Sequence, residues 1–121
     1  MRTLLFVYGT LKRGGRLHGH MAGGRFVAEA ATVPRYRLLR VGWYPGLVDA
    51  AGGTAVVGEL WEVEADHLRR LDDVEGVAEG LFERRSVELQ VAAGAEVQAY
   101  FYARSAEGLP DAGECWDVSH G

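Results

Sequence analysis

The chain has 121 residues, of which 48% are hydrophobic and 25% charged, and its formal net charge is −4. This length suits a single domain over residues 1–121, and the composition is that of an ordinary globular protein. The negative charge argues against nonspecific nucleic-acid binding as the main role. The one cysteine, Cys115, excludes an internal disulfide and suits a reducing compartment. The apolar run 4–8 is too short for a signal segment or a membrane span, so we expect a cytoplasmic protein.

In the first half of the chain, apolar and β-branched runs predict strands over residues 3–8, 25–33 and 35–41. Gly9 ends the first of these strands, and a cationic, glycine-rich loop follows. A short helix is expected within residues 18–24. Residues 42–48 indicate a turn followed by a short apolar piece.

In the second half, strong strand patterns cover residues 55–63, 85–91 and 96–103. The last two are predicted to form a hairpin, with Val97, Ala99 and Phe101 on one face and Tyr100 and Tyr102 on the other. One clear helix begins at or just before Asp66 and is followed by Gly76. Residues 105–121 have weak periodicity and indicate a tail or flap.

About six or seven short strands with one main helix and many glycine turns favour an α+β fold. We expect a small, mixed, curled or barrel-like sheet with the helix packed across it.

The most informative residue is an acid on the apolar stripe of the predicted helix. Leu68, Leu71 and Glu75 are spaced i, i+3, i+7 and therefore share one helix face, which points Glu75 inward. Burial and the negative end of the helix dipole would both raise the pKa of this carboxyl toward neutrality, as a general acid/base requires. The alternative is a frayed last turn that exposes Glu75 to solvent.

The second signal is the loop that follows the first strand. A glycine directly after a buried strand lets consecutive backbone N–H groups approach a carboxylate or an oxyanion. Lys12, Arg13, Arg16 and Arg25 would add positive charge nearby. No Gly-Lys-Ser/Thr sequence is present, so this is not a phosphate-binding Walker loop. A plain glycine turn with solvated cations is an equally good interpretation.

Other reactive side chains carry weaker signals. Cys115 could act as a nucleophile, but an incidental thiol in a loose tail is the better interpretation. His18 and His20 lack a third metal ligand at a suitable spacing. Tyr100 and Tyr102 could line a pocket or face water with equal probability.

Four segments in this order resemble the γ-glutamylcyclotransferase family, which includes the γ-glutamylamine cyclotransferases and the plant avirulence-induced-gene-like proteins. The segments are VYGTLKRG at residues 7–14, YPGL at 44–47, GELWEV at 58–63, and LDDVEG at 71–76 with Phe82-Glu83-Arg84 after it. The resemblance covers about residues 3–103, and the first and last segments are specific when they occur together at this separation.

The resemblance implies a reaction in which the α-amino group of a γ-glutamyl unit attacks that unit's own γ-carbonyl. 5-Oxoproline forms, an amine or amino acid leaves, and no metal or organic cofactor is needed. It implies that Glu75 is the catalytic general acid/base and that the substrate is a small molecule. It also implies that substrate is bound by Tyr8, Gly9, Thr10, Leu11 and Tyr102.

One departure from the family pattern concerns Phe82, where relatives often carry tyrosine. A lost hydroxyl would shift specificity or weaken the functional comparison. A non-catalytic binding or regulatory module for a small acidic metabolite is therefore the main alternative, and an interaction domain without a pocket is a third.

Overall fold

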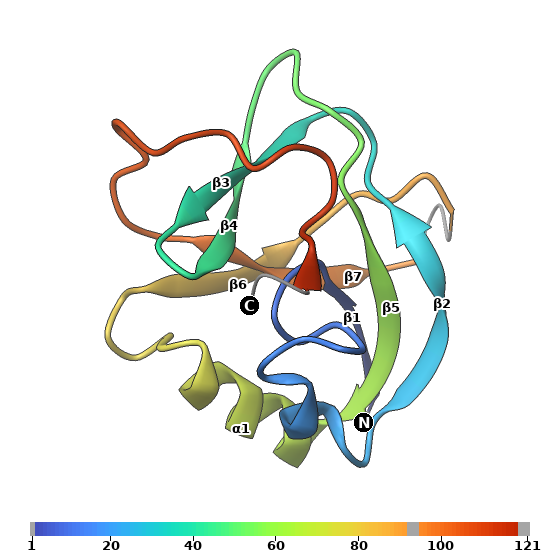
Figure 1. The fold of residues 1–121 in the computed structure, drawn as a ribbon. Coiled ribbons are helices and arrows are strands. Elements are labelled where there is room, and N and C mark those ends of the chain that lie inside the picture. Colours follow the sequence, from blue (N-terminus) through green and yellow to red (C-terminus); the bar gives the residue numbers. More distant parts are fainter. Residues whose placement is uncertain (1, 92–94, 119–121) are drawn as a thin grey trace.

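A computed structural model describes residues 2–91 and 95–118. Within these residues the chain forms one seven-stranded sheet, an α-helix and a short 3-10 helix. The strands are β1 (Arg2–Val7), β2 (Arg25–Ala31), β3 (Tyr36–Val41), β4 (Tyr44–Asp49), β5 (Val57–Glu64), β6 (Phe82–Ser86) and β7 (Val97–Tyr102). The helices are η1 (His18–Met21) and α1 (Ala65–Val74). The predicted α+β class with a curled sheet and one main helix is confirmed (Figure 1).

The sheet branches at β7. Its strand order is β2-β5-β1-β7-β4-β3, and β6 runs antiparallel along the other edge of β7. Both β1 and β4 pair in parallel with the same edge of β7, β1 through Leu4 and Leu5 and β4 through Leu47 opposite Phe101. β1 therefore leaves this edge of β7 before β4 joins it. The chain that follows β1 departs from the sheet in the gap between these two strands.

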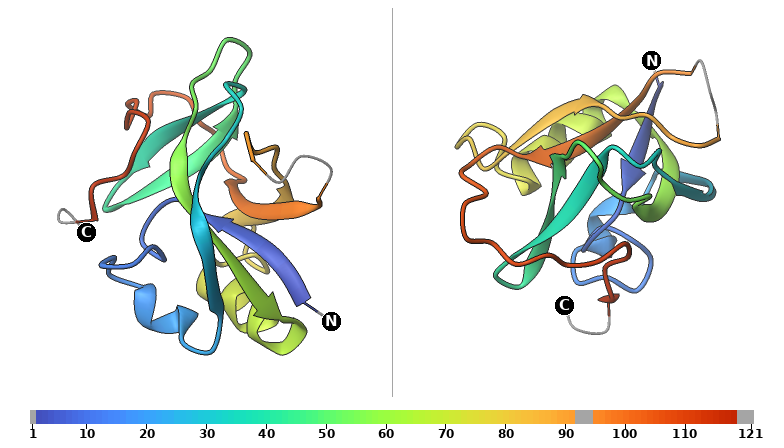
Figure 2. Two further views of the ribbon diagram at one scale, coloured as in Figure 1. Left: turned by 90° about the vertical axis from the view of Figure 1, so that its right-hand side faces the viewer. Right: turned by 90° about the horizontal axis from the view of Figure 1, so that it is seen from above.

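The sheet has apolar packing on both faces. The predicted alternation along β7 is confirmed, because Val97, Ala99 and Phe101 belong to one core cluster and Tyr100 packs in the other. The second cluster also contains Leu68 and Leu71 of α1, so the helix covers this face of the sheet (Figures 1 and 2). No helix in the described part of the chain is long and apolar enough to span a membrane.

The segment after β7 covers the core cluster that contains Val97, Ala99 and Phe101. Residues 105–118 run beside β3 and reach the start of β5, where the Val57 N–H donates to the Glu114 carbonyl at 2.8 Å. Trp116 lies in the core cluster with 3% of its surface exposed, so it anchors the segment. The last three residues of the predicted tail, 119–121, lie outside the described residues.

Two predicted elements are wrong in detail. The apolar piece expected after a turn at residues 42–48 is the full strand β4, which forms a hairpin with β3 through Gly42 and Trp43. The strand expected over 85–91 begins and ends earlier, as β6 (Phe82–Ser86). Beyond β6 the chain crosses toward β2, where the Glu88 N–H donates to the Tyr36 hydroxyl and Leu89 bridges Thr32. Val87 and Leu89 are buried as their alternation predicts, but Val91 is exposed.

We predict that Trp116→Ala lowers the free energy of unfolding by about 3 kcal/mol, because it removes a large buried side chain from the first core cluster. Urea denaturation followed by circular dichroism measures this loss. Trp43→Ala is the matched control, since Trp43 is 44% exposed and its truncation should cost much less. Equal losses in the two variants would show that the C-terminal segment does not stabilise the core.

Candidate active site

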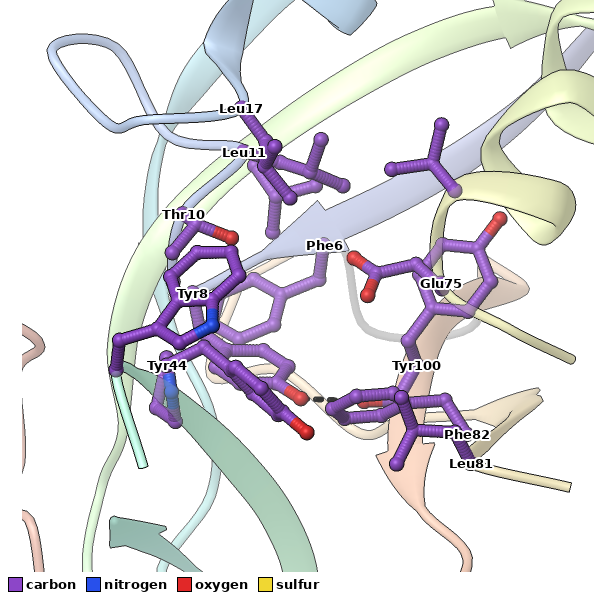
Figure 3. Close-up of a pocket in the computed structure, with 15 residues that line it drawn as sticks. Phe6, Tyr8, Thr10, Leu11, Leu17, Tyr44, Glu75, Leu81, Phe82 and Tyr100 are labelled. Carbon is purple, nitrogen blue, oxygen red and sulfur yellow. Dashed lines mark hydrogen bonds between the residues drawn. The ribbon is translucent and has the colours of Figure 1, made fainter. Parts of the chain in front are cut away.

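One cavity brings the two predicted signals together. It encloses about 580 Å³ of space, including the part open to solvent. Glu75 lines it together with Tyr8, Gly9, Thr10 and Leu11 (Figure 3). The other lining residues are Phe6, Val7, Leu17, Trp43, Tyr44, Pro45, Val74, Leu81, Phe82 and Tyr100.

The end of α1 fixes the position of Glu75. The helix ends at Val74, one residue earlier than the sequence pattern suggests, and Glu75 is its C-cap. Gly76 has a φ of +68°, and the N–H groups of Gly76 and Val77 donate to the carbonyls of Asp73 and Asp72. This pairing is a Schellman motif, which requires a left-handed residue just after the cap. The glycine therefore holds the backbone of Glu75 at a fixed point beside the cavity.

The Glu75 carboxyl is desolvated and without a protein partner. Burial raises its pKa to about 7. Within residues 2–91 and 95–118, the Glu75 side chain forms no hydrogen bond or ion pair. In Figure 3 the carboxyl points into the cavity. A carboxyl in this state can accept a proton near neutral pH and is free to meet a ligand.

The loop after β1 supplies candidate donors at the same cavity. Among the described residues, the N–H groups of Gly9, Thr10 and Leu11 donate none of the turn, loop or cap hydrogen bonds. A side chain at Gly9 would place its Cβ 2.6 Å from Pro45 Cγ, so close packing against β4 requires the glycine. Buried N–H groups without partners are unfavourable unless a ligand or water satisfies them.

The four cations expected near this loop do not surround the cavity, which differs from the prediction. Lys12 is buried, and its Nζ donates to the Trp116 carbonyl at 2.8 Å. Arg13 pairs with Glu59 at 3.0 Å, and Arg25 pairs with Glu62 at 3.2 Å. These three charges are therefore committed to structural contacts, and Arg16 is the exception.

A hydrogen-bond network holds the aromatic wall of the cavity. The Tyr100 hydroxyl donates to Asp72 Oδ1 at 2.7 Å, and Arg84 binds the same carboxylate through Nε and Nη2 at 2.9 and 3.1 Å. Burial, with the Asp72 hydrogen bond and charge, raises the pKa of Tyr100 well above its usual value. Burial also raises the pKa of Tyr8, whose hydroxyl donates to the Tyr100 carbonyl at 2.6 Å. Both phenols therefore stay protonated and position the site.

Sequence reasoning missed several cavity residues. Trp43 and Tyr44 come from the β3–β4 hairpin, and Leu17 comes from the far end of the loop. Tyr44 lies in the YPGL segment but had no predicted role, and no motif distinguished Trp43 and Leu17 from ordinary apolar residues. Phe82, which the sequence analysis noted as a departure, is 4% exposed and lines the cavity. Tyr102 is not among the lining residues; its ring packs edge-on against Phe82, which does line the cavity, with the centroids 5.8 Å apart.

The weaker reactive side chains lie away from the cavity. Cys115 is exposed, with its Sγ 3.6 Å from Lys12 Nζ, and it does not line the cavity. His18 Nδ1 lies 3.0 Å from the Leu11 carbonyl oxygen. In the part of the chain that the structure describes, no group of three histidine, cysteine, aspartate or glutamate side chains could hold a metal ion.

Comparisons with known proteins found similar sequences and a similar fold. The sequence model of the family described as "Gamma-glutamyl cyclotransferase, AIG2-like" matches residues 5–118. The chain is 36% identical over 121 residues to human gamma-glutamylaminecyclotransferase, across 84% of this chain and 78% of the relative. It is 39% identical over 77 residues to a Vibrio cholerae homologue that bears the gamma-glutamylcyclotransferase name, across 64% of this chain and 65% of the relative. A crystal structure of a mouse AIG2-like protein superposes with a TM-score of 0.83 at 32% identity, across 96% of this chain and 88% of that one.

We predict that Glu75→Gln stabilises the protein above pH 7 by an amount on the order of 1–3 kcal/mol. The folded-state pKa of about 7 lies above the ordinary value of 4.5, so wild-type stability is lost as pH rises between them. The glutamine variant lacks this loss, and its advantage should grow from pH 4.5 to pH 7. Urea unfolding at several pH values measures it, with Asp73→Asn, an exposed neighbour, as the control. A pH-independent difference would contradict the burial of the Glu75 carboxyl.

Proposed function

We propose that this chain, which belongs to the gamma-glutamyl cyclotransferase, AIG2-like family, releases 5-oxoproline from γ-glutamyl amides. The observation that carries the proposal is the unpartnered Glu75 carboxyl, with its pKa near 7, in one cavity with the Gly9–Thr10–Leu11 backbone. The substrate is a small molecule with a γ-glutamyl unit, and the leaving group is an amine or an amino acid.

In the proposed reaction, the α-nitrogen of the glutamyl unit forms a bond to its own γ-carbon. Glu75 removes a proton from the α-ammonium group, which leaves the nitrogen lone pair free to attack. In the tetrahedral intermediate, the bond from the γ-carbon to the leaving nitrogen breaks as Glu75 returns this proton to that nitrogen. The attacking nitrogen gives up its second proton through the ionised Glu75 to the released amine, which leaves in its ammonium form. Bond formation and bond cleavage balance, and no electrons are transferred, so the scheme requires no redox cofactor.

The cavity supports this role because it constrains a flexible chain. Ring closure requires a bent glutamyl unit, and holding reacting groups together supplies much of the advantage of such reactions. Leu11 and Leu17 lie on one side of the cavity, with Tyr44 and Phe82 on the other (Figure 3). The N–H groups of residues 9–11 are placed to bind either the α-carboxylate or the oxyanion that develops on the γ-carbonyl.

Tyr8 has a positioning role in this proposal. Its hydroxyl donates to the Tyr100 carbonyl and accepts from the Leu47 N–H at 3.1 Å. With its one proton committed and its pKa raised, it is a poor proton donor or acceptor for substrate. Tyr8 therefore shapes the cavity floor, while Glu75 carries the proton.

We predict that Glu75→Gln lowers kcat for 5-oxoproline release by roughly 10²- to 10⁴-fold, the usual contribution of a general acid/base. Glutamine keeps the size of the side chain but cannot take a proton. The assay compares wild type, Glu75→Gln and the surface control Asp73→Asn on a panel of γ-glutamyl amines and amino acids. Full activity of Glu75→Gln would show that the proton passes through another group.

The pH dependence gives a separate prediction. Because the base must be ionised, kcat/KM should rise with pH to a midpoint near the Glu75 pKa of about 7. The residual activity of Glu75→Gln should lack this acidic limb. A wild-type limb centred near 4.5, where an exposed glutamate titrates, would contradict the role of the desolvated carboxyl.

The alternative of a non-catalytic binding module has its own signature. Glutamate-like compounds would raise the melting temperature through RT ln(1 + [L]/Kd), and no γ-glutamyl compound would yield 5-oxoproline. The unengaged carboxyl and the cavity walls fit both functions, so product formation is the observation that separates them.

A further inference from the structure

Arg16 lies at the mouth of the cavity. Its neighbour Leu17 lines the cavity, and its guanidinium carbon lies 4.6 Å from the ring centroid of Trp43, another lining residue. Trp43 is 44% exposed and sits at the tip of the β3–β4 hairpin, with its ring edge-on to Tyr44 at 5.1 Å. Arg16 is therefore held at the outer rim of the site, beside the exposed Trp43.

The charge of Arg16 is available to a ligand. Most of the arginines form ion pairs with acidic side chains, namely Arg2, Arg13, Arg25, Arg35, Arg37, Arg69, Arg84 and Arg85. Among the described residues, Arg16 contacts no carboxylate, and its recorded interaction is with the indole face of Trp43. Stacking on an indole restrains a guanidinium and leaves its N–H groups free.

We infer that Arg16 and Trp43 form a subsite for a carboxylate on the leaving group. The chain would therefore prefer γ-glutamyl amino acids that carry a free carboxylate over γ-glutamyl amines that lack one. This inference rests on the proposed function. A planar guanidinium can bind a carboxylate with two parallel hydrogen bonds, which gives geometric selection as well as attraction.

A second cation, Arg104, lies near the mouth of the cavity, and its effect must be distinguished from that of Arg16. Arg104 acts electrostatically on the Tyr44 hydroxyl, and its Nη2 donates to the Glu79 carbonyl at 3.2 Å. Arg104 thus already has a protein partner and stands beside Tyr44 rather than Trp43. Substituting each arginine alone distinguishes the two positions.

The test uses two substrates that differ only in the carboxylate, γ-glutamyl-alanine and γ-glutamyl-ethylamine. We expect wild type to release 5-oxoproline from γ-glutamyl-alanine with a kcat/KM about five- to tenfold higher, a modest ratio because the ion pair is partly exposed. Arg16→Gln should bring this ratio close to one, mainly through KM for γ-glutamyl-alanine. Trp43→Leu should lower the ratio in part, because the guanidinium loses its platform.

Two control variants match the charge change. Arg35→Gln removes a surface charge that pairs with Glu88, so both kcat/KM values should stay at wild-type levels. Arg104→Gln should retain the preference for γ-glutamyl-alanine. Raising the salt concentration from 0.05 to 0.5 M should lower the wild-type ratio, since exposed charges are screened.

Three results would overturn the inference. They are a wild-type ratio near one, an equal loss of both activities in Arg16→Gln, and a loss of the preference in Arg104→Gln instead. Turnover of both substrates with equal efficiency would leave the proposed function standing and remove this inference alone. If neither substrate nor the wider panel of γ-glutamyl compounds gave 5-oxoproline, the proposed function itself would fall.

Discussion

The site depends on the two hydrogen bonds of one phenol. The Tyr8 hydroxyl donates to the Tyr100 carbonyl and accepts from the Leu47 N–H. These bonds lie at the gap along β7 between the end of its pairing with β1 and the start of its pairing with β4. Without these bonds, two buried backbone groups would lose their partners at a cost of about 1–3 kcal/mol each. Tyr8 therefore joins β4 and β7 across the branch in the sheet. The same residue starts the loop whose next three members line the cavity.

A second anchor sets the opposite wall. Asp72 lies on α1 three residues before Glu75, and it accepts hydrogen bonds from Tyr100 of β7 and Arg84 of β6. The helix end is thereby tied to the sheet, and the Schellman motif at Gly76 fixes the turn that follows. Arg84 and the Tyr100 hydroxyl are engaged with Asp72 rather than with Glu75. The unpartnered carboxyl weakens the folded state at neutral pH, a cost typical of functional sites.

Local patterns predicted much of this arrangement. The i, i+3, i+7 stripe predicted that Glu75 points inward, and the structure places it just after α1, as the C-cap, in the lining of the cavity. The alternation along β7 assigned its two faces correctly. Contacts distant in sequence were not readable. The choice between Tyr100 and Tyr102 depends on where Phe82 of the neighbouring strand packs, and β6 ends early because the chain turns toward β2. Trp43 and Tyr44 reach the cavity only because the β3–β4 hairpin folds over Gly9, which a local pattern cannot encode.

The sequence also suggested two features that conflict physically. A cationic loop around the site and a glutamate with a pKa near neutrality are incompatible, because a cation within about 4–6 Å typically lowers a carboxyl pKa by 1–3 units. The structure separates them: Lys12 turns to the C-terminal segment and Arg13 turns to Glu59, so that burial alone acts on Glu75. Positive charge remains at the rim, where Arg16 stacks on Trp43. A charge at that position can attract an anionic substrate without lowering the pKa of Glu75. A general base that works near neutral pH requires both properties.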